Sequence, residues 1–270
     1  MFYLIHENPV RDTHHKKLVE QMGKMGLQYE LFQYSPFDVD ITFSTKRKDV
    51  WVFGTFSIVH MVNKYGFYPG SMYNANHDFE VYAPKYGSHM LNHDAVVLNF
   101  TDPLPEDKKW DMFFARPCGD TKAFTGQVLM RHSWESYVQQ QIDNDNLRYI
   151  KDHPESIRVL ISPLKEIISE TRCWIIGGKV ATMSEYKNGR RVLAANKDHD
   201  LDLKAKVQRL ADIYQPAEAF VLDVCLLENS DELKIVEINC MNCSGFYEAN
   251  MELLLHALEL HFNDRTLITE

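Results

Sequence analysis

The chain has 270 residues, of which 45% are hydrophobic and 12% aromatic, so it can bury a substantial core and is not a disordered segment. Its formal net charge of -9 argues against broad binding to the phosphate backbone of nucleic acid. Five cysteines do not make a disulfide framework, and no apolar stretch approaches the ~18 residues of a membrane span. We therefore expect a cytoplasmic protein (in the host cytoplasm if viral) without a nucleic-acid or membrane partner.

The first hundred residues predict a unit in which strands and helices alternate. Apolar strands are expected at 1–6, 29–34, 49–54 and 93–100, and helices at 12–26 and 55–66. This alternation predicts a small parallel sheet. The segment 101–107, TDPLPED, contains two prolines and several acids, and we expect it to link this unit to the rest of the chain.

Residues 101–270 follow a different pattern, in which short turns join some strands directly. Strands are expected at 109–118, at 157–163, in two parts of 171–186, at 219–227 and at 233–239, with helices at 133–144, 202–215 and 247–262. Gly177-Gly178 is a strong signal for a two-residue hairpin turn, which would pair Arg172 with Met183. Hairpins mixed with helices predict an antiparallel α+β sheet that is covered on one face.

The hairpin within 219–239 brings two acidic side chains together. Side chains alternate along a strand, and a turn centred on Ser230 places Asp223 directly opposite Glu237. Asn239 lies on the same face. Like charges in this arrangement destabilise a sheet, so we expect a compensating group. A magnesium ion fits, because it takes oxygen ligands from one or two carboxylates and from substrate phosphates.

The same register gives the hairpin one apolar face. It pairs Leu222 with Ile238 and Val224 with Val236 in the core, and it leaves Ile235 on the side of the carboxylates. The alternative interpretation is that the carboxylate face is simply solvated, because strand acids that face water are common. A slip of one residue in the register would separate the two carboxylates.

Cys240 and Cys243 form a C-x-x-C directly after this hairpin. Structural zinc normally needs four ligands, and neither a second C-x-x-C nor suitably spaced histidines accompany this one. A redox C-x-x-C is expected in a thioredoxin-like setting, which an E-x-N hairpin is not. We therefore expect these cysteines to line the turn from strand to helix, near the substrate.

Three segments in order resemble the ATP-grasp superfamily of carboxylate–amine ligases, and most of all a clade common in phages and bacteria that is named for one arginine and two lysines. These segments are FFARPCGDTKAFTG at 113–126, 159–186 and 221–247. Residues 66–97 also resemble the N-terminal part of that clade. The resemblance implies an α/β + α+β architecture: an ATP-grasp fold at 101–270, with two α+β lobes clasping ATP, preceded by a small α/β N-terminal domain at 1–100.

The resemblance also implies roles for individual residues. It implies that Asp223, Glu237 and Asn239 are magnesium ligands. It implies that the catalytic groups at the transferred phosphate are Arg116, Lys122 and Arg172. Those that bind ATP are Lys122, Thr125, Ser162, Pro163, Leu164, Lys165 and Glu170. In this assignment 162–164 border the adenine and Glu170 holds the ribose hydroxyls. Cys118 would be an unusual neighbour for phosphate if its thiol were ionised.

Several of these assignments have a structural alternative. Lys122 lies in a loop that matches no P-loop pattern, and it could be an ordinary exposed lysine. Arg172 could form a structural ion pair with Glu170, its neighbour on the same strand face. Lys165 could reach the phosphates or face water. Both Lys165 and Lys179 are candidates for the second lysine of the clade.

The reaction that the resemblance implies is an ATP- and magnesium-dependent ligation. ATP phosphorylates a carboxylate, and an amine displaces the phosphate from the acylphosphate to leave an amide or peptide bond. The substrates would be an amino acid, a peptide or a protein terminus. The alternatives are a phosphotransferase acting on a small molecule and a non-catalytic nucleotide-binding effector. The loops 66–74 and 240–250 are candidates for the specificity pocket, and the sequence carries no signal for an oligomeric state.

Overall fold

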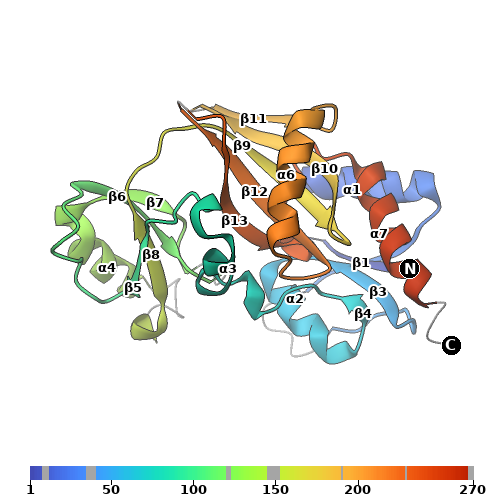
Figure 1. Cartoon of the computed structure of the whole chain (residues 1–270). Coiled ribbons are helices and arrows are strands. Elements are labelled where there is room, and N and C mark those ends of the chain that lie inside the picture. Colours follow the sequence, from blue (N-terminus) through green and yellow to red (C-terminus); the bar gives the residue numbers. More distant parts are fainter. Residues whose placement is uncertain are drawn as a thin grey trace.

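The computed structural model describes residues 1–7, 12–34, 41–119, 123–144, 153–189, 191–228 and 230–266. These residues form three sheets, which we call the N-terminal sheet, the small sheet and the large sheet. The small sheet occupies one end of the molecule, at the left in Figure 1, and the large sheet lies between it and the N-terminal sheet. None of the helices in these ranges is long and apolar enough to cross a membrane.

The N-terminal sheet has the strand order β2-β1-β3-β4, and all of its pairs are parallel. Its elements are β1 (Phe2–His6), α1 (Asp12–Met25), β2 (Gln28–Phe32), β3 (Asp49–Phe53), α2 (Phe56–Val62) and β4 (Tyr68–Gly70). The parallel sheet expected from the alternation of strands and helices is confirmed. Strand β4 is additional, since no strand was predicted between the helix at 55–66 and the strand at 93–100.

The small sheet is antiparallel, with the order β5-β8-β6-β7. Its elements are β5 (Val96–Asn99), β6 (Met112–Pro117), β7 (Gln127–Met130), α4 (Trp134–Ile142) and β8 (Arg158–Ser162). The strand expected at 93–100 is β5, which pairs with β8 here rather than with the N-terminal sheet. Helix α4 packs Trp134 and Val138 onto the face that carries Phe113 and Ala115.

The large sheet is antiparallel, with the order β11-β10-β9-β12-β13. Its strands are β9 (Ile167–Ile176), β10 (Lys179–Asn188), β11 (Arg191–Asn196), β12 (Ala219–Leu227) and β13 (Leu233–Cys240). Three helices pack around it, namely α3 (Phe79–Tyr86), α6 (Leu201–Ile213) and α7 (Met251–Thr266). Residues 163–166 join β8 to β9 and so connect the small sheet to the large sheet.

The expectation that this sheet is covered on one face is wrong. Leu222 packs in one cluster with Val207 of α6, whereas the adjacent Val221 packs in another cluster with Leu254 of α7. Both faces are covered because the start of β12 is apolar at consecutive positions. Asp223 follows Val221 by two residues on β12, so its side chain points to the same face of the sheet, the face that α7 covers at Val221. The polar part of this face lies beyond the cover of α7.

The turn at Gly177-Gly178 is confirmed, and both residues have positive φ angles (56° and 74°), as a type I′ turn requires. The predicted pairing of Arg172 with Met183 is wrong, because Arg172 lies opposite Ser184. A β-bulge between Val180 and Thr182 adds one residue to β10 and shifts the register by that residue.

The register of β12 and β13 is confirmed at its centre, where Asp223 lies opposite Glu237. Beyond this pair the prediction is wrong, since Val224 lies opposite Ile235 and not opposite Val236. A bulge in β13 accounts for the shift. It turns Ile235 into the core, where the side chain is fully buried.

We expect Gly177→Ala to destabilise the fold, because the residue combines a left-handed φ with a close neighbour. An added Cβ would lie 2.5 Å from His261 Nδ1. The free energy of unfolding, measured by urea denaturation, should fall by about 1–3 kcal/mol. Gly23→Ala is the matched control. It lies inside α1 with open space around it, and it should raise the same quantity by about 0.5–1 kcal/mol. Effects of the same sign in both variants would contradict this account.

Candidate active site

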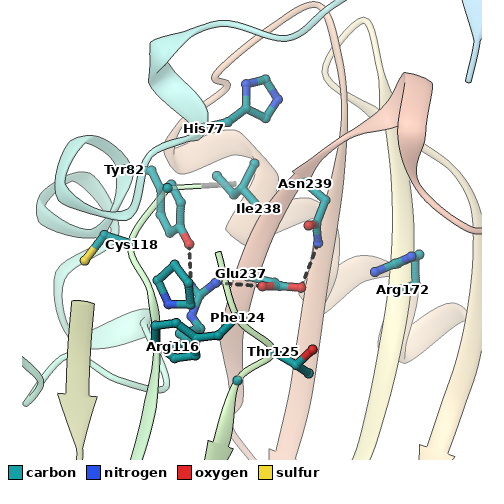
Figure 2. Close-up of a pocket in the computed structure, with 13 residues that line it drawn as sticks. His77, Tyr82, Arg116, Cys118, Phe124, Thr125, Arg172, Glu237, Ile238 and Asn239 are labelled. Carbon is teal, nitrogen blue, oxygen red and sulfur yellow. Dashed lines mark hydrogen bonds and ion pairs between the residues drawn. The ribbon is translucent and has the colours of Figure 1, made fainter. Parts of the chain in front are cut away.

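Three parts of the chain meet at a cavity of about 310 Å³. The small sheet contributes Arg116 and the large sheet contributes Arg172, while the segment before the small sheet contributes His77 and Tyr82. Of the residues predicted for the site, those that line this cavity are Arg116, Thr125, Arg172, Glu237 and Asn239. Figure 2 shows them gathered around the end of β13.

Arg172 and Asp223 form a buried, two-pronged ion pair on adjacent strands. Arg172 Nε donates to Asp223 Oδ1 at 2.9 Å and Nη2 donates to Oδ2 at 2.7 Å, while Nη1 donates to the Gly245 carbonyl at 3.2 Å. Asp223 is only 1% exposed, and burial raises the pKa of its carboxyl against the opposing effect of the guanidinium. The alternative partner for Arg172, Glu170, is not the one that it contacts.

Arg116 forms the second ion pair, and this one joins two sheets. Its Nη1 donates to Glu237 Oε2 on β13 at 2.7 Å, and its Nη2 donates to the Tyr82 hydroxyl of α3 at 2.9 Å (Figure 2). Burial raises the pKa of Tyr82, so this hydroxyl remains protonated at neutral pH. Tyr82 was not predicted for the site, because no motif connects this residue with strands that follow it by thirty or more positions.

Asn239 connects the two ion pairs. Its Nδ2 donates to Asp223 Oδ2 at 3.1 Å and to Glu237 Oε1 at 3.0 Å. Two carboxylates and an amide oxygen are donors of the kind that magnesium prefers, so the three residues fit that ion. Asn239 would then turn its amide so that the oxygen replaces the Nδ2 that now faces both carboxylates.

Comparison with known proteins places the chain in a family. The model of an ATP-grasp domain, family 3 of the clade named for one arginine and two lysines, matches residues 74–258. The chain belongs to this ATP-grasp family. No curated protein sequence matches it.

Solved structures support the same fold across the whole chain. D-cycloserine synthetase DcsG matches with a TM-score of 0.61 at 11% identity, covering 97% of this chain and 100% of that one. The ATP-grasp ligase PsnB, bound to a minimal precursor, has a TM-score of 0.60 at 12% identity, covering 96% and 98%. D-alanine–D-alanine ligase of Bacillus anthracis, bound to ATP, has a TM-score of 0.60 at 13% identity, covering 98% of each chain. At these identities the likeness shows the fold, and the predicted ATP-grasp fold is confirmed.

Gly126, the last residue before β7, lies close to Arg116. Lys122 lies outside the described residues, and Thr125 is exposed at the cavity. Gly126 is needed here, because a Cβ would lie 2.8 Å from Phe114 Cζ and 3.2 Å from Arg116 Cβ. Burial raises the pKa of the Cys118 thiol to about 12, so the thiol is neutral and compatible with a nearby anion.

The face of the small sheet that carries Arg116 continues as an apolar surface. The pairing of β6 with β7 and β8 sets Met112, Val128 and Met130 on this face, together with Ser162. The three apolar side chains are among the exposed large hydrophobic residues. An exposed apolar strip therefore extends from the cavity along the small sheet.

The residues predicted to contact the adenine and ribose do not line the cavity around Arg116. Ser162 is buried, and its hydroxyl donates to Asn92 Oδ1 at 3.0 Å. Pro163 and Leu164 lie in the connection to β9, where Leu164 is 45% exposed. Lys165 forms an ion pair with Asp94.

Glu170 is buried on the strand face of the large sheet that also carries Arg172. It accepts a hydrogen bond from the Tyr186 hydroxyl at 2.7 Å and forms an ion pair with Lys187. Sequence reasoning missed both partners, because it is the two bulges in β10 that place Lys187 opposite Glu170. Lys179, one of the two candidate lysines, is exposed beside the Gly177-Gly178 turn.

The two loops predicted to form the specificity pocket meet at Asn242. Its Nδ2 donates to the carbonyls of Val52 at 2.7 Å and Gly70 at 3.1 Å, and its Oδ1 accepts from the Met72 backbone at 2.8 Å. The end of β13 is thereby fixed to the carboxyl ends of β3 and β4. Within the described residues, no group of three or more His, Cys, Asp or Glu side chains could hold a metal ion, so Cys240 and Cys243 have no such set around them.

His77 is a second cavity residue that sequence reasoning missed. It is 2% exposed, and its ring stacks on Tyr73 with centroids 5.6 Å apart. Its Nε2 has no hydrogen-bond partner among the described residues. Burial lowers the pKa of His77 to about 4, so the ring is neutral at neutral pH.

We expect this buried histidine to make the fold sensitive to acid. The folded-state pKa of about 4 lies below the ordinary value of 6.5, so the unfolded chain binds the proton more readily between these pH values. Stability is therefore full above pH 6.5 and falls as the pH drops toward 4, by about 2–3 kcal/mol at an assay pH of about 4.5. Urea denaturation above pH 6.5 and at about pH 4.5 should show that His77→Gln loses less unfolding free energy between these conditions than the unmodified protein. The exposed His93→Gln is the control and should keep the loss of the unmodified protein.

Proposed function

We propose that the protein is an ATP- and magnesium-dependent ligase that joins a carboxylate to an amine through an acylphosphate. The observation that carries this proposal is the network of Arg116, Glu237, Asn239, Asp223 and Arg172, which lies at a cavity between two sheets of an ATP-grasp fold. Phosphoryl transfer depends mainly on positioning and electrostatic stabilisation, and such a network supplies both.

The apolar strip of the small sheet is the proposed surface for the adenine. Met112, Val128 and Met130 offer a flat apolar wall, and residues 162–164 lie at the connection next to it. Ligand sites commonly combine such walls with a few polar groups. Glu170 would bind the ribose hydroxyls beside Lys187, and Lys165 would have to leave Asp94 to reach the phosphates.

The charged network is the proposed site for the phosphates. Arg116 and Arg172 balance the charges of Asp223 and Glu237, so the network is close to neutral without a metal. Asp223, Glu237 and Asn239 would hold magnesium, which when bound neutralises charge on the phosphates of ATP. Thr125, at the cavity with Arg116, would bind phosphate oxygens, and Lys122, three residues before Thr125 in the sequence, is proposed for the same role.

Arg172 is the proposed contact for the acid substrate. Within the described residues, three of its five N–H donors are used by Asp223 and the Gly245 carbonyl, which leaves two for a ligand in the cavity that Arg172 lines. They suit the oxygens of a carboxylate as it accepts the γ-phosphoryl group. In that transfer the bond between the γ-phosphorus and the bridging oxygen of ADP breaks. The amine nitrogen then attacks the carbonyl carbon, the C–O bond to the phosphate breaks with its electron pair leaving on the phosphate, and the proton that the nitrogen loses passes to solvent.

The substrates are proposed to be an amino acid, a peptide or a protein terminus. The names of the similar structures support this range, since they include a D-alanine–D-alanine ligase and a ligase bound to a precursor peptide. A screen of acid and amine pairs, scored by ADP release and product mass, tests the proposal. ADP release that requires both substrates supports a ligase. A phosphorylated product formed without an amine would instead indicate a phosphotransferase, and ATP binding without turnover would indicate an effector.

We expect Glu237→Gln to abolish activity while preserving the fold. The amide keeps a carbonyl oxygen for Arg116 but loses the charge that magnesium requires. Magnesium-dependent ADP release should fall by about a hundredfold or more. The exposed Glu232→Gln on the same hairpin is the matched control and should retain activity. Turnover that is unchanged in Glu237→Gln, with circular dichroism confirming the fold, would refute the assignment.

A further inference from the structure

Tyr247 has an unusual backbone conformation beside the candidate active site. Among the described residues it is the one non-glycine residue with a positive φ, at 48°. A left-handed conformation is unfavourable for a residue with a bulky side chain, and it persists where the surrounding structure fixes it. Strain of this kind concentrates at functional sites, so the contacts that hold this residue bear on what it does.

Hydrogen bonds fix the chain immediately after Tyr247. The Glu248 amide donates to Ser184 Oγ at 3.1 Å, and the Asn250 amide donates to Thr182 Oγ1 at 3.0 Å, so the segment is attached to β10 at two points. On the other side, Phe246 is buried in the core against α7. The left-handed residue therefore stands between two fixed points.

The ring of Tyr247 lies against Arg172. It stacks on Tyr186 with ring centroids 5.0 Å apart and planes 12° apart. Arg172 Cζ lies 5.1 Å from the centroid of Tyr247 and 5.7 Å from that of Tyr186. Both distances are within the range of a cation–π interaction. The two stacked rings thus restrain the guanidinium on a different side from the one that Asp223 holds.

The other restraints on Arg172 come from its hydrogen bonds. Asp223 holds the Nε side of the guanidinium and the Gly245 carbonyl accepts from Nη1. Gly245 belongs to the same loop as Tyr247, so this one loop contributes both a hydrogen bond and an aromatic ring. A shift of the loop would release both at once.

We propose that Tyr247 is a positioning residue that, together with Tyr186, holds Arg172 so that its two remaining N–H donors face the oxygens of the acid substrate. This inference rests on the proposed ligase function. Phe246, the residue before Tyr247, is buried in the core, while the ring of Tyr247 lies against Arg172. The left-handed backbone at Tyr247 allows these adjacent side chains to take both positions.

The test compares Tyr247→Leu, which removes the aromatic ring, with Tyr247→Phe, which retains it. With an acid and amine pair found in the screen, kcat/KM for the acid should fall about tenfold in the Leu variant and stay within about threefold in the Phe variant. The KM for ATP should change little in either, because Arg172 is assigned to the acid. Tyr29→Leu, a partly exposed tyrosine of β2, is the matched control.

A second readout needs no turnover. Hydrogen exchange of the Arg172 Nε–H, measured by NMR on the full chain, should become about tenfold faster in Tyr247→Leu and remain unchanged in Tyr247→Phe. A Phe variant as impaired as the Leu variant, or an Nε–H signal unaffected by Leu, overturns the positioning role. If the unmodified protein releases no ADP with any pair, the ligase proposal fails and the role toward an acid fails with it, whereas the exchange data still report whether Tyr247 holds Arg172.

Discussion

The site depends on one constraint: Asp223 and Glu237 face each other on adjacent strands, and Asp223 is buried. Two negative charges in this position are unfavourable unless cations accompany them. Arg172 pairs with Asp223 within the large sheet, and Arg116 reaches Glu237 from the small sheet. The second pair therefore joins the two sheets that enclose the cavity. Removing either arginine would leave a carboxylate without its counter-charge and would also loosen a wall of the site.

Binding of magnesium and phosphate at such a site would have to exchange partners, whereas Arg172 keeps two N–H donors for a further ligand. The atoms proposed to bind magnesium and phosphate already contact one another through Asn239 and the two arginines. Because each charge already has a counter-charge, ATP and magnesium would replace one set of ion pairs by another and would leave no carboxylate or arginine uncompensated. The same balance explains how two carboxylates and two arginines can share a largely buried network.

The local parts of this arrangement could be predicted from the sequence. The turn at Gly177-Gly178 has a strong signal, and an ideal hairpin places Asp223 opposite Glu237. The bulges in β10 and β13 could not be predicted, because one added residue costs little locally and is selected by packing. Turning Ile235 into the core buries its side chain completely, which favours the bulge and is visible only in the folded protein.

The contacts between distant segments account for the rest of what the sequence did not reveal. Tyr82 and His77 come from a segment more than thirty residues before Arg116, and no spacing rule connects them with the site. The sequence predicted a compensating cation beside the two carboxylates and named magnesium for it. The ion pairs with Arg116 and Arg172, which were assigned as catalytic groups, also supply positive charge at these carboxylates. The two assignments are therefore coupled, because a metal ion beside Asp223 and Glu237 would share the charge compensation that Arg116 and Arg172 supply.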